Sequence, residues 1–168
     1  MNTRRLFFAF WPDDELRRSF ESARQRLFPL SGRPVEIANL HMTVAFLGAV
    51  PVERVPALQL LSGPIAPCPI ELDRLEHWGK QKVLVAGTTH EPQALKQQVD
   101  SLWLRLGRLG FAREPRPFRP HVTLVRDIRS VRPDAAWTTV NWRADRLQLV
   151  ESIATPGGVR YELPGGSR

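Results

Sequence analysis

The chain has 168 residues, a hydrophobic share of 42% and a formal net charge of +7. This length and hydrophobicity exclude a disordered chain and allow a core that buries roughly two-thirds of the unfolded surface without a metal or a disulfide. No apolar run approaches the length of a membrane span. Cys68 is the single cysteine, so an internal disulfide is impossible. We therefore expect one cytoplasmic domain over residues 1–168.

Arginine supplies nearly all of the positive charge, since the only lysines are Lys80, Lys82 and Lys96. A guanidinium offers a planar fork of donors that suits phosphate, and a basic chain favours a polyanionic partner. A GC-rich coding bias would also replace lysine by arginine, without any functional meaning. The charge alone therefore does not decide between a polyanion-binding protein and a compositional bias.

The first half of the chain predicts a strand, a helix and a second strand. An apolar run followed by Pro12 and three acidic residues is typical of a central strand that leads into a helix. Pro56 lies too far inside the next helical segment for a straight helix, so we expect that segment to be bent or split. In chain order, the predicted elements are a strand at 6–10, a helix from 12 to about 27, a loop or short strand at 32–39, a strand at 41–47 and the bent helix at 51–61.

The second half predicts a similar order of elements. Gly79 and its neighbours indicate a hairpin turn, and a long helix begins near Pro92 and is closed by Gly110. The residues from Pro164 to the end, 164–168, predict a disordered tail. The predicted elements are strands at 70–78 and 82–86, a helix at 91–109, a loop at 114–120, a strand at 121–125, a loop at 130–137 and strands at 146–153 and 159–163.

Two His-x-Thr segments are the most informative feature, because each ends a strand–helix–strand unit. Side chains alternate faces along a strand, so His41 and Thr43 share one face, and His121 and Thr123 do the same. Apolar residues at the alternate positions can anchor each strand to a core. One such segment is a weak indication, since histidine and threonine are common in half-buried strands. Two strands of this kind facing one another would form a polar cleft.

This residue set suits the opening of a cyclic phosphodiester, in which water loses a proton and a sugar oxygen gains one. Histidine titrates near neutrality, so one imidazole can act as base and the other as acid, with a bell-shaped pH profile. The threonine hydroxyls can donate to the non-bridging phosphate oxygens. Arg126 can add a cationic fork for the phosphate. Strict alternation from His121 puts Arg126 on the opposite face, so its role requires a bulge or a strand end.

Two histidines can also bind zinc. The chain has no H-E-x-x-H motif, no cysteine cluster and no obvious carboxylate ligand beside either histidine. Threonine is a poor zinc ligand. We therefore expect neither a metal nor a cofactor.

The two segments and their flanks resemble the 2H phosphoesterase superfamily, and within it the RNA 2',3'-cyclic phosphodiesterases, formerly described as 2'-5' RNA ligases. The resemblance covers most of the chain and rests on residues 5–9, 39–48 and 119–124. It implies an α+β, bilobal fold in which two antiparallel sheets face a central cleft with pseudo-twofold symmetry. It also implies metal-independent hydrolysis of a 2',3'-cyclic phosphate to a 2'-phosphomonoester, with weak 2'-5' RNA ligation in the reverse direction.

The resemblance also implies a role for each motif residue. His41 would be the proton donor to the leaving 3' oxygen, and His121 the proton acceptor that activates water. Thr43 and Thr123 would hold the phosphate. The implied partner is RNA with a 2',3'-cyclic phosphate end, tRNA fragments included, or a small cyclic nucleotide, bound by a monomer that has no membrane and no obligate protein partner.

Other residues are weaker candidates for substrate contacts. Phe7 can flank a base, whereas alternation puts Phe46 on the face away from His41 and predicts that it belongs to the core. Arg119 precedes the second motif and either contacts RNA phosphates or belongs to a solvated basic loop. Trp78 is either an aromatic residue at the cleft lip or a packing residue.

Two other functions stay open on the sequence. The same cleft would serve a phosphodiesterase for another 2'-linked nucleotide, such as a 2'-5' oligoadenylate or a cyclic ADP-ribose phosphate. A non-enzymatic module that binds RNA ends would also use a basic cleft, although simple binding does not require the second histidine–threonine pair.

Overall fold

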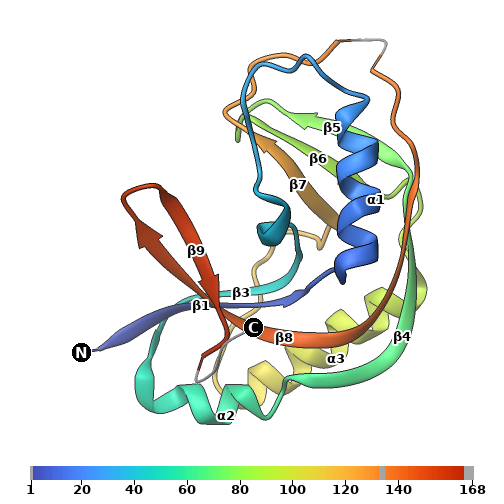
Figure 1. Ribbon diagram of the computed structural model, residues 1–168. Coiled ribbons are helices and arrows are strands. Elements are labelled where there is room, and N and C mark those ends of the chain that lie inside the picture. Colours follow the sequence, from blue (N-terminus) through green and yellow to red (C-terminus); the bar gives the residue numbers. More distant parts are fainter. Residues whose placement is uncertain (1, 133–134, 165–168) are drawn as a thin grey trace.

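The computed structural model describes residues 2–132 and 135–164 (Figure 1). The strands are β1 (Thr3–Phe10), β2 (Arg33–Pro34), β3 (Met42–Pro51), β4 (Gly63–Leu72), β5 (Arg74–Trp78), β6 (Val83–Gly87), β7 (His121–Arg126), β8 (Val140–Thr155) and β9 (Gly158–Glu162). The α-helices are α1 (Asp14–Gln25), α2 (Val55–Gln59) and α3 (Gln93–Arg108), and the 3-10 helices are Ile37–Asn39 and Val52–Arg54.

Within the described residues, these strands form two antiparallel sheets. The first has the order β3-β1-β8-β4, with β9 paired to β8, and the second has the order β2-β7-β6-β5. The first half of the long strand β8 pairs with β4, and its second half pairs with β1 and β9. Figure 1 shows the second sheet above the first. Helix α3 packs against β4 and β3 of the first sheet. The predicted α+β fold with two antiparallel sheets is confirmed.

Each sheet contains one of the strand–helix–strand units that the sequence predicts. β1 and β3 pair in the first sheet and are separated in the chain by α1, whereas β6 and β7 pair in the second and are separated by α3. Helix α1 begins where expected, because the Asp13 carboxylate accepts a hydrogen bond of 2.8 Å from the Leu16 N–H and so caps the first turn. The two units present the two motif histidines from different sheets.

One hydrophobic core joins the two sheets. Phe8 and Phe10 of β1 are buried in this core together with Phe20 of α1 and Leu124 of β7. Phe7 and Ala9, in the alternate phase of β1, belong to a smaller cluster with Val150 of β8. The alternation of β1 therefore separates a core face from a face that is available to the site.

The predicted strand at 70–78 is wrong, because the chain changes sheet in its middle. β4 ends at Leu72 in the first sheet, and β5 begins at Arg74 in the second. Between them, the Asp73 carboxylate accepts a hydrogen bond of 2.8 Å from the Thr89 N–H. The hairpin of β5 and β6 is confirmed, as is the split of the predicted helix at 51–61 into a 3-10 helix and α2.

The predicted disordered tail at 164–168 falls mostly outside the described residues. Its first residue, Pro164, is buried, and its carbonyl oxygen accepts a hydrogen bond from the Gln59 side chain. The predicted loop at 130–137 also includes two undescribed positions, 133 and 134, and its other residues have no regular structure. Among the described helices, none is both long and apolar enough to cross a bilayer.

Candidate active site

His41 lies directly before β3 and is surrounded by aromatic rings. It stacks on Trp11 with a centroid distance of 4.8 Å and an interplanar angle of 6°. Phe7 and Tyr161 lie at centroid distances of 5.2 and 5.0 Å from it. Phe7 exposes only 3% of its surface, so its position favours support of His41 over stacking on a base.

His121 begins β7 and lies beside a charged cluster. Its ring lies against Trp78 with a centroid distance of 4.5 Å. The Arg119 guanidinium covers Trp78 at 4.8 Å from the ring centroid and forms an ion pair with Glu76. The Trp78 Nε1–H donates to the same carboxylate at 3.0 Å. Trp78 is therefore a cleft residue, and Arg119 is held in place by Glu76.

The two imidazoles share one hydrogen-bond arrangement. Nδ1 of His41 lies 2.7 Å from the carbonyl oxygen of Asn39, and Nδ1 of His121 lies 2.8 Å from that of Arg119. In each motif the carbonyl belongs to the residue two positions before the histidine. A carbonyl oxygen only accepts, so Nδ1 carries a proton in both rings. Nε2 is then the nitrogen that can exchange a proton with a substrate.

A β-bulge directly follows the threonine of each motif. In β3 the register with β1 shifts after Thr43, which makes Val44 the extra residue. In β7 the register with β6 shifts after Thr123, which makes Leu124 the extra residue. A bulge of one residue reverses the faces of all side chains that follow it.

These bulges decide where Phe46 and Arg126 point. Arg126 lines a cavity together with Thr123, so the bulge that its proposed role requires is present. The prediction that Phe46 belongs to the core is wrong, because the bulge turns it to the cleft side, where it is 39% exposed. The Arg5 guanidinium lies 4.7 Å from the centroid of the Phe46 ring.

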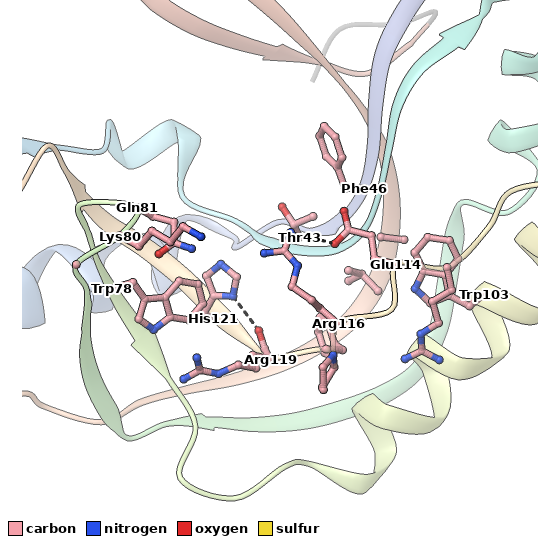
Figure 2. A pocket seen from close by; sticks show the side chains of 16 residues that line it. Thr43, Phe46, Trp78, Lys80, Gln81, Trp103, Glu114, Arg116, Arg119 and His121 are labelled. Carbon is pink, nitrogen blue, oxygen red and sulfur yellow. Dashed lines mark hydrogen bonds and ion pairs between the residues drawn. The ribbon is translucent and has the colours of Figure 1, made fainter.

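Two adjoining cavities meet at the motif strands. The His41 cavity has a volume of about 520 Å³, and its lining also includes Thr123, Arg126, Arg5 and Tyr161. The His121 cavity has a volume of about 600 Å³, and its lining also includes Trp78 and the arginines of the loop at 113–119 (Figure 2). Thr43 and Phe46 line both cavities. Each histidine thus has its own cavity. Thr43 lies where these cavities join, and Thr123 lines the His41 cavity.

Three residues of the site carry no assignment from the sequence: Trp11, Arg5 and Tyr161. Arg5 and Trp11 could have been found, because they occupy alternate positions in the same run as Phe7 and so share its face. Tyr161 had no comparable signal. It reaches His41 because β9 pairs with β8, a contact that depends on the tertiary structure.

The buried Arg24 of α1 connects this helix to β7 and to Val35, the residue after β2. Its Nη1 donates to the carbonyl oxygen of Val35 at 2.5 Å and to that of Leu124 at 3.3 Å. The Leu124 carbonyl also accepts from the Val35 N–H at 2.9 Å. Burial lowers the pKa of the Arg24 guanidinium, and the charges of nearby Glu21 and Glu36 oppose that effect. Helix α1 is in this way tied to the bulge residue of β7.

The surroundings of His121 favour a neutral ring. Burial lowers its pKa from the ordinary value of 6.5, and the charges of Arg119 and Arg126 also lower it. The hydrogen bond to the Arg119 carbonyl and the charge of Glu76 act in the opposite direction. A neutral imidazole near pH 7 is the form that accepts a proton.

No group of three or more histidine, cysteine, aspartate or glutamate side chains that could hold a metal ion occurs in residues 2–132 and 135–164.

Two antiparallel sheets that each present a His-x-Thr strand are the arrangement expected of a phosphoesterase with paired motifs. Comparison with known proteins supports this class. A family model described as LigT-like phosphoesterase matches residues 10–85, and the chain belongs to this family. A protein of Escherichia coli K12 named RNA 2',3'-cyclic phosphodiesterase is 40% identical over 126 residues, which cover 73% of this chain and 72% of that protein. One of the same name from Archaeoglobus fulgidus is 27% identical over 172 residues and covers 94% and 96%.

The structure of E. coli LigT complexed with 3'-AMP superimposes on this chain with a TM-score of 0.80 and 34% identity, and the match covers 95% of this chain and 94% of LigT. The similarity therefore extends over both sheets.

Proposed function

We propose that this chain hydrolyses the 2',3'-cyclic phosphate of RNA ends or of nucleosides to a 2'-phosphomonoester without a metal ion. One observation carries the proposal: two imidazoles with the same Nδ1 arrangement border two cavities that meet at Thr43. The names of the E. coli and A. fulgidus relatives support this substrate class. Both sheets contribute to the site, which supports one functional unit over the whole chain.

In the proposed step, the phosphate lies where the cavities join, next to Thr43, Thr123 and Arg126. Nε2 of His121 takes a proton from water as the water oxygen bonds to phosphorus. The bond from phosphorus to O3' breaks, and O3' receives the proton of the His41 imidazolium. The threonine hydroxyls and the guanidinium donate to the non-bridging oxygens, whose charge grows in the transition state.

The environments of the two histidines support this division of roles. The lowered pKa of His121 keeps it neutral and able to accept a proton. The stacked Trp11 and the nearby Tyr161 surround His41 with aromatic rings, and the face of such a ring attracts a cation. These ring contacts support the assignment of the proton donor to His41.

The proposed partner is an RNA end with a cyclic phosphate, tRNA fragments included, in the cytoplasm. Reversal of the same proton transfers would join RNA ends through a 2'-5' bond. Binding of RNA ends without turnover is disfavoured, because two histidines with equivalent geometry go beyond what binding requires.

The test is hydrolysis of adenosine 2',3'-cyclic phosphate in EDTA, with the product identified by phosphorus NMR. We expect the 2'-phosphate, with full activity in EDTA and a large loss of activity in His41→Ala and in His121→Ala. His90→Ala is the matched control, because His90 is exposed and lines neither cavity. A product with the phosphate on O3' would reverse the leaving group, and activity lost in EDTA would contradict a metal-independent reaction.

A substrate panel separates the remaining alternatives. A higher kcat/KM for a 2'-5' oligoadenylate or for a cyclic ADP-ribose phosphate than for RNA cyclic phosphates would assign the site to that substrate. Tight binding of RNA ends with no turnover from about pH 5 to about pH 9 would indicate a binding module.

A further inference from the structure

Trp11 is stacked on His41 but lies outside both cavities. The two rings are parallel to within 6°, with a centroid distance of 4.8 Å. Phe7 and Tyr161 also lie against His41, and both line the His41 cavity. Among the described residues that line the two cavities, Trp11 is absent. Trp11 is therefore placed to act on the imidazole and not on a bound ligand.

The indole of Trp11 and the imidazole of His41 are held by neighbouring carbonyl groups. The Trp11 Nε1–H donates to the carbonyl oxygen of Ala38 at 3.2 Å. The His41 Nδ1–H donates to the carbonyl oxygen of Asn39 at 2.7 Å. Both carbonyls belong to the 3-10 helix Ile37–Asn39, so this one short helix holds the two rings side by side.

The backbone of Trp11 also restrains its ring. The residue before a proline is confined to extended conformations, and Pro12 follows Trp11. Trp11 thus continues the alternation of β1 beyond the end of this strand, and its side chain packs against the cluster that contains Phe7 and Ala9. The indole is therefore restrained by its backbone, by its packing and by its hydrogen bond.

A restrained ring beside His41 matters because the hydrogen bond at Nδ1 does not define the plane of the imidazole. The torsion between Cβ and the ring of a histidine has a broad energy minimum, so neighbouring groups set the ring plane. A proton donor must lie within about 3.2 Å of the accepting oxygen, and hydrogen bonds weaken steeply below a donor angle of about 120°. A parallel ring limits the tilt of the imidazole and so keeps Nε2 in one direction.

We propose that Trp11 is a positioning residue for the proton donor His41. This rests on the proposed function, in which Nε2 of His41 gives its proton to O3' as the bond between phosphorus and O3' breaks. The parallel indole holds the imidazole in the plane that this transfer requires. Since Trp11 lines neither cavity, its loss should slow the chemical step and leave substrate binding unchanged.

The test compares two substitutions of Trp11 on adenosine 2',3'-cyclic phosphate. Trp11→Leu removes the parallel ring and should lower kcat about tenfold or more with KM unchanged, because small displacements of a catalytic group are costly. Trp11→Phe keeps a flat ring and should retain kcat within about threefold.

Trp137→Leu is the matched control for these substitutions. Trp137 is also half-buried, and its Nε1–H also donates to a carbonyl oxygen, that of Leu72, at 2.7 Å. It lies in the segment before β8 and lines neither cavity. We therefore expect kcat and KM of this variant to be unchanged.

An altered leaving group shows whether Trp11 acts through His41. An analogue with sulfur in place of O3' needs no proton donor, since a thiol with a pKa near about 8.5 is a good leaving group. On this analogue, Trp11→Leu should react as fast as the unchanged protein in a single-turnover assay, which measures the chemical step. In the His41→Ala background, Trp11→Leu should cause no further loss on the oxygen substrate. General loosening of the site would lower the rate in both comparisons.

Several results would overturn the positioning role. They are an unchanged kcat in Trp11→Leu, a loss confined to KM, an equal loss on the oxygen and sulfur substrates, and a loss in Trp11→Phe as large as that in Trp11→Leu. Absence of hydrolysis in the unchanged protein would instead overturn the proposed function. If the melting temperature shows that Trp11→Leu does not fold, Trp11→Met gives the same comparison, because methionine fills space with a flexible side chain that fixes no ring plane.

Discussion

β3 and β7 share a local design. In each, the histidine Nδ1 meets the carbonyl oxygen two residues before it, and a bulge follows the threonine. The side chains that surround the two histidines differ, because they come from other elements. His41 is enclosed by Trp11, Phe7 and Tyr161 from β1 and from the hairpin of β8 and β9, whereas His121 lies near charged groups of β5 and of the loop before β7.

The second position after each bulge residue shows the same contrast. It is Phe46 in β3 and Arg126 in β7, and both turn toward the His41 cavity. On our proposal, one backbone arrangement presents a proton donor in β3 and a proton acceptor in β7, and the neighbouring side chains distinguish the two imidazoles. The predictions below test whether the two strands differ in the proposed way.

The largest expected effect is loss of either motif histidine. His41→Ala and His121→Ala should each lower kcat about 10²- to 10⁴-fold on a nucleoside 2',3'-cyclic phosphate. An analogue with sulfur in place of O3' separates them, since a thiol with a pKa near about 8.5 leaves without a proton donor. His41→Ala should regain most of its rate on this analogue in a steady-state assay, and His121→Ala should not. Rescue of His121→Ala alone would exchange the two roles.

The next largest effect concerns the residues after the bulges. Arg126→Met should lower kcat/KM about 10²-fold, because in the proposed step the guanidinium donates to phosphate oxygens whose charge grows in the transition state. Phe46→Leu is the matched change in the other strand and should cost about tenfold at most, mainly in KM, since it removes only an aromatic contact. Both are measured by steady-state kinetics beside thermal unfolding. Equal losses confined to KM would show that Arg126 binds the ground state only.

A smaller effect is expected in the pH profile. The acidic limb of kcat/KM reports the base that must be neutral, so activity falls as pH drops through the pKa of His121. Since this pKa is lowered from 6.5, the limb should lie below that value. Arg119→Gln removes a charge that lowers the pKa and should move the limb to higher pH. Glu76→Gln removes a charge that raises it and should move the limb to lower pH.

Arg119→Gln and Glu76→Gln serve as controls for each other, because both break the ion pair between Arg119 and Glu76. A shift in the same direction for both would mean that the broken pair, and not the charge near His121, changes the profile.

The smallest effect is expected for Arg24, which links α1 to β7. Arg24→Met removes the donor shared by the Val35 and Leu124 carbonyls and should destabilise the protein by about 1–3 kcal/mol in urea unfolding. If Arg24 also holds the bulge that directs Arg126, kcat/KM should fall about threefold, and this fall should vanish in the Arg126→Met background. An equal fall in both backgrounds would limit Arg24 to general stability.

The sequence predicts correctly which face of the strand each side chain occupies from the histidine to the threonine of each motif. Beyond the threonine, this prediction fails. His41 with Thr43 and His121 with Thr123 are separated by one residue, and alternation over that distance is a property of the backbone. Phe46 was assigned to the wrong face and Arg126 was left conditional on a bulge, because a bulge is a mismatch with a partner strand. The strand at 70–78 failed for a similar reason, since its two halves pair with different sheets.

The sequence by itself determined most of the elements and the paired motifs, because apolar runs, helix starts and alternation are local properties of the chain. Only the tertiary structure decided that Tyr161 reaches His41, that Glu76 and Arg119 lie near His121, and that two cavities join at Thr43. These contacts connect residues far apart in the chain, so they depend on which strands pair and how the two sheets pack.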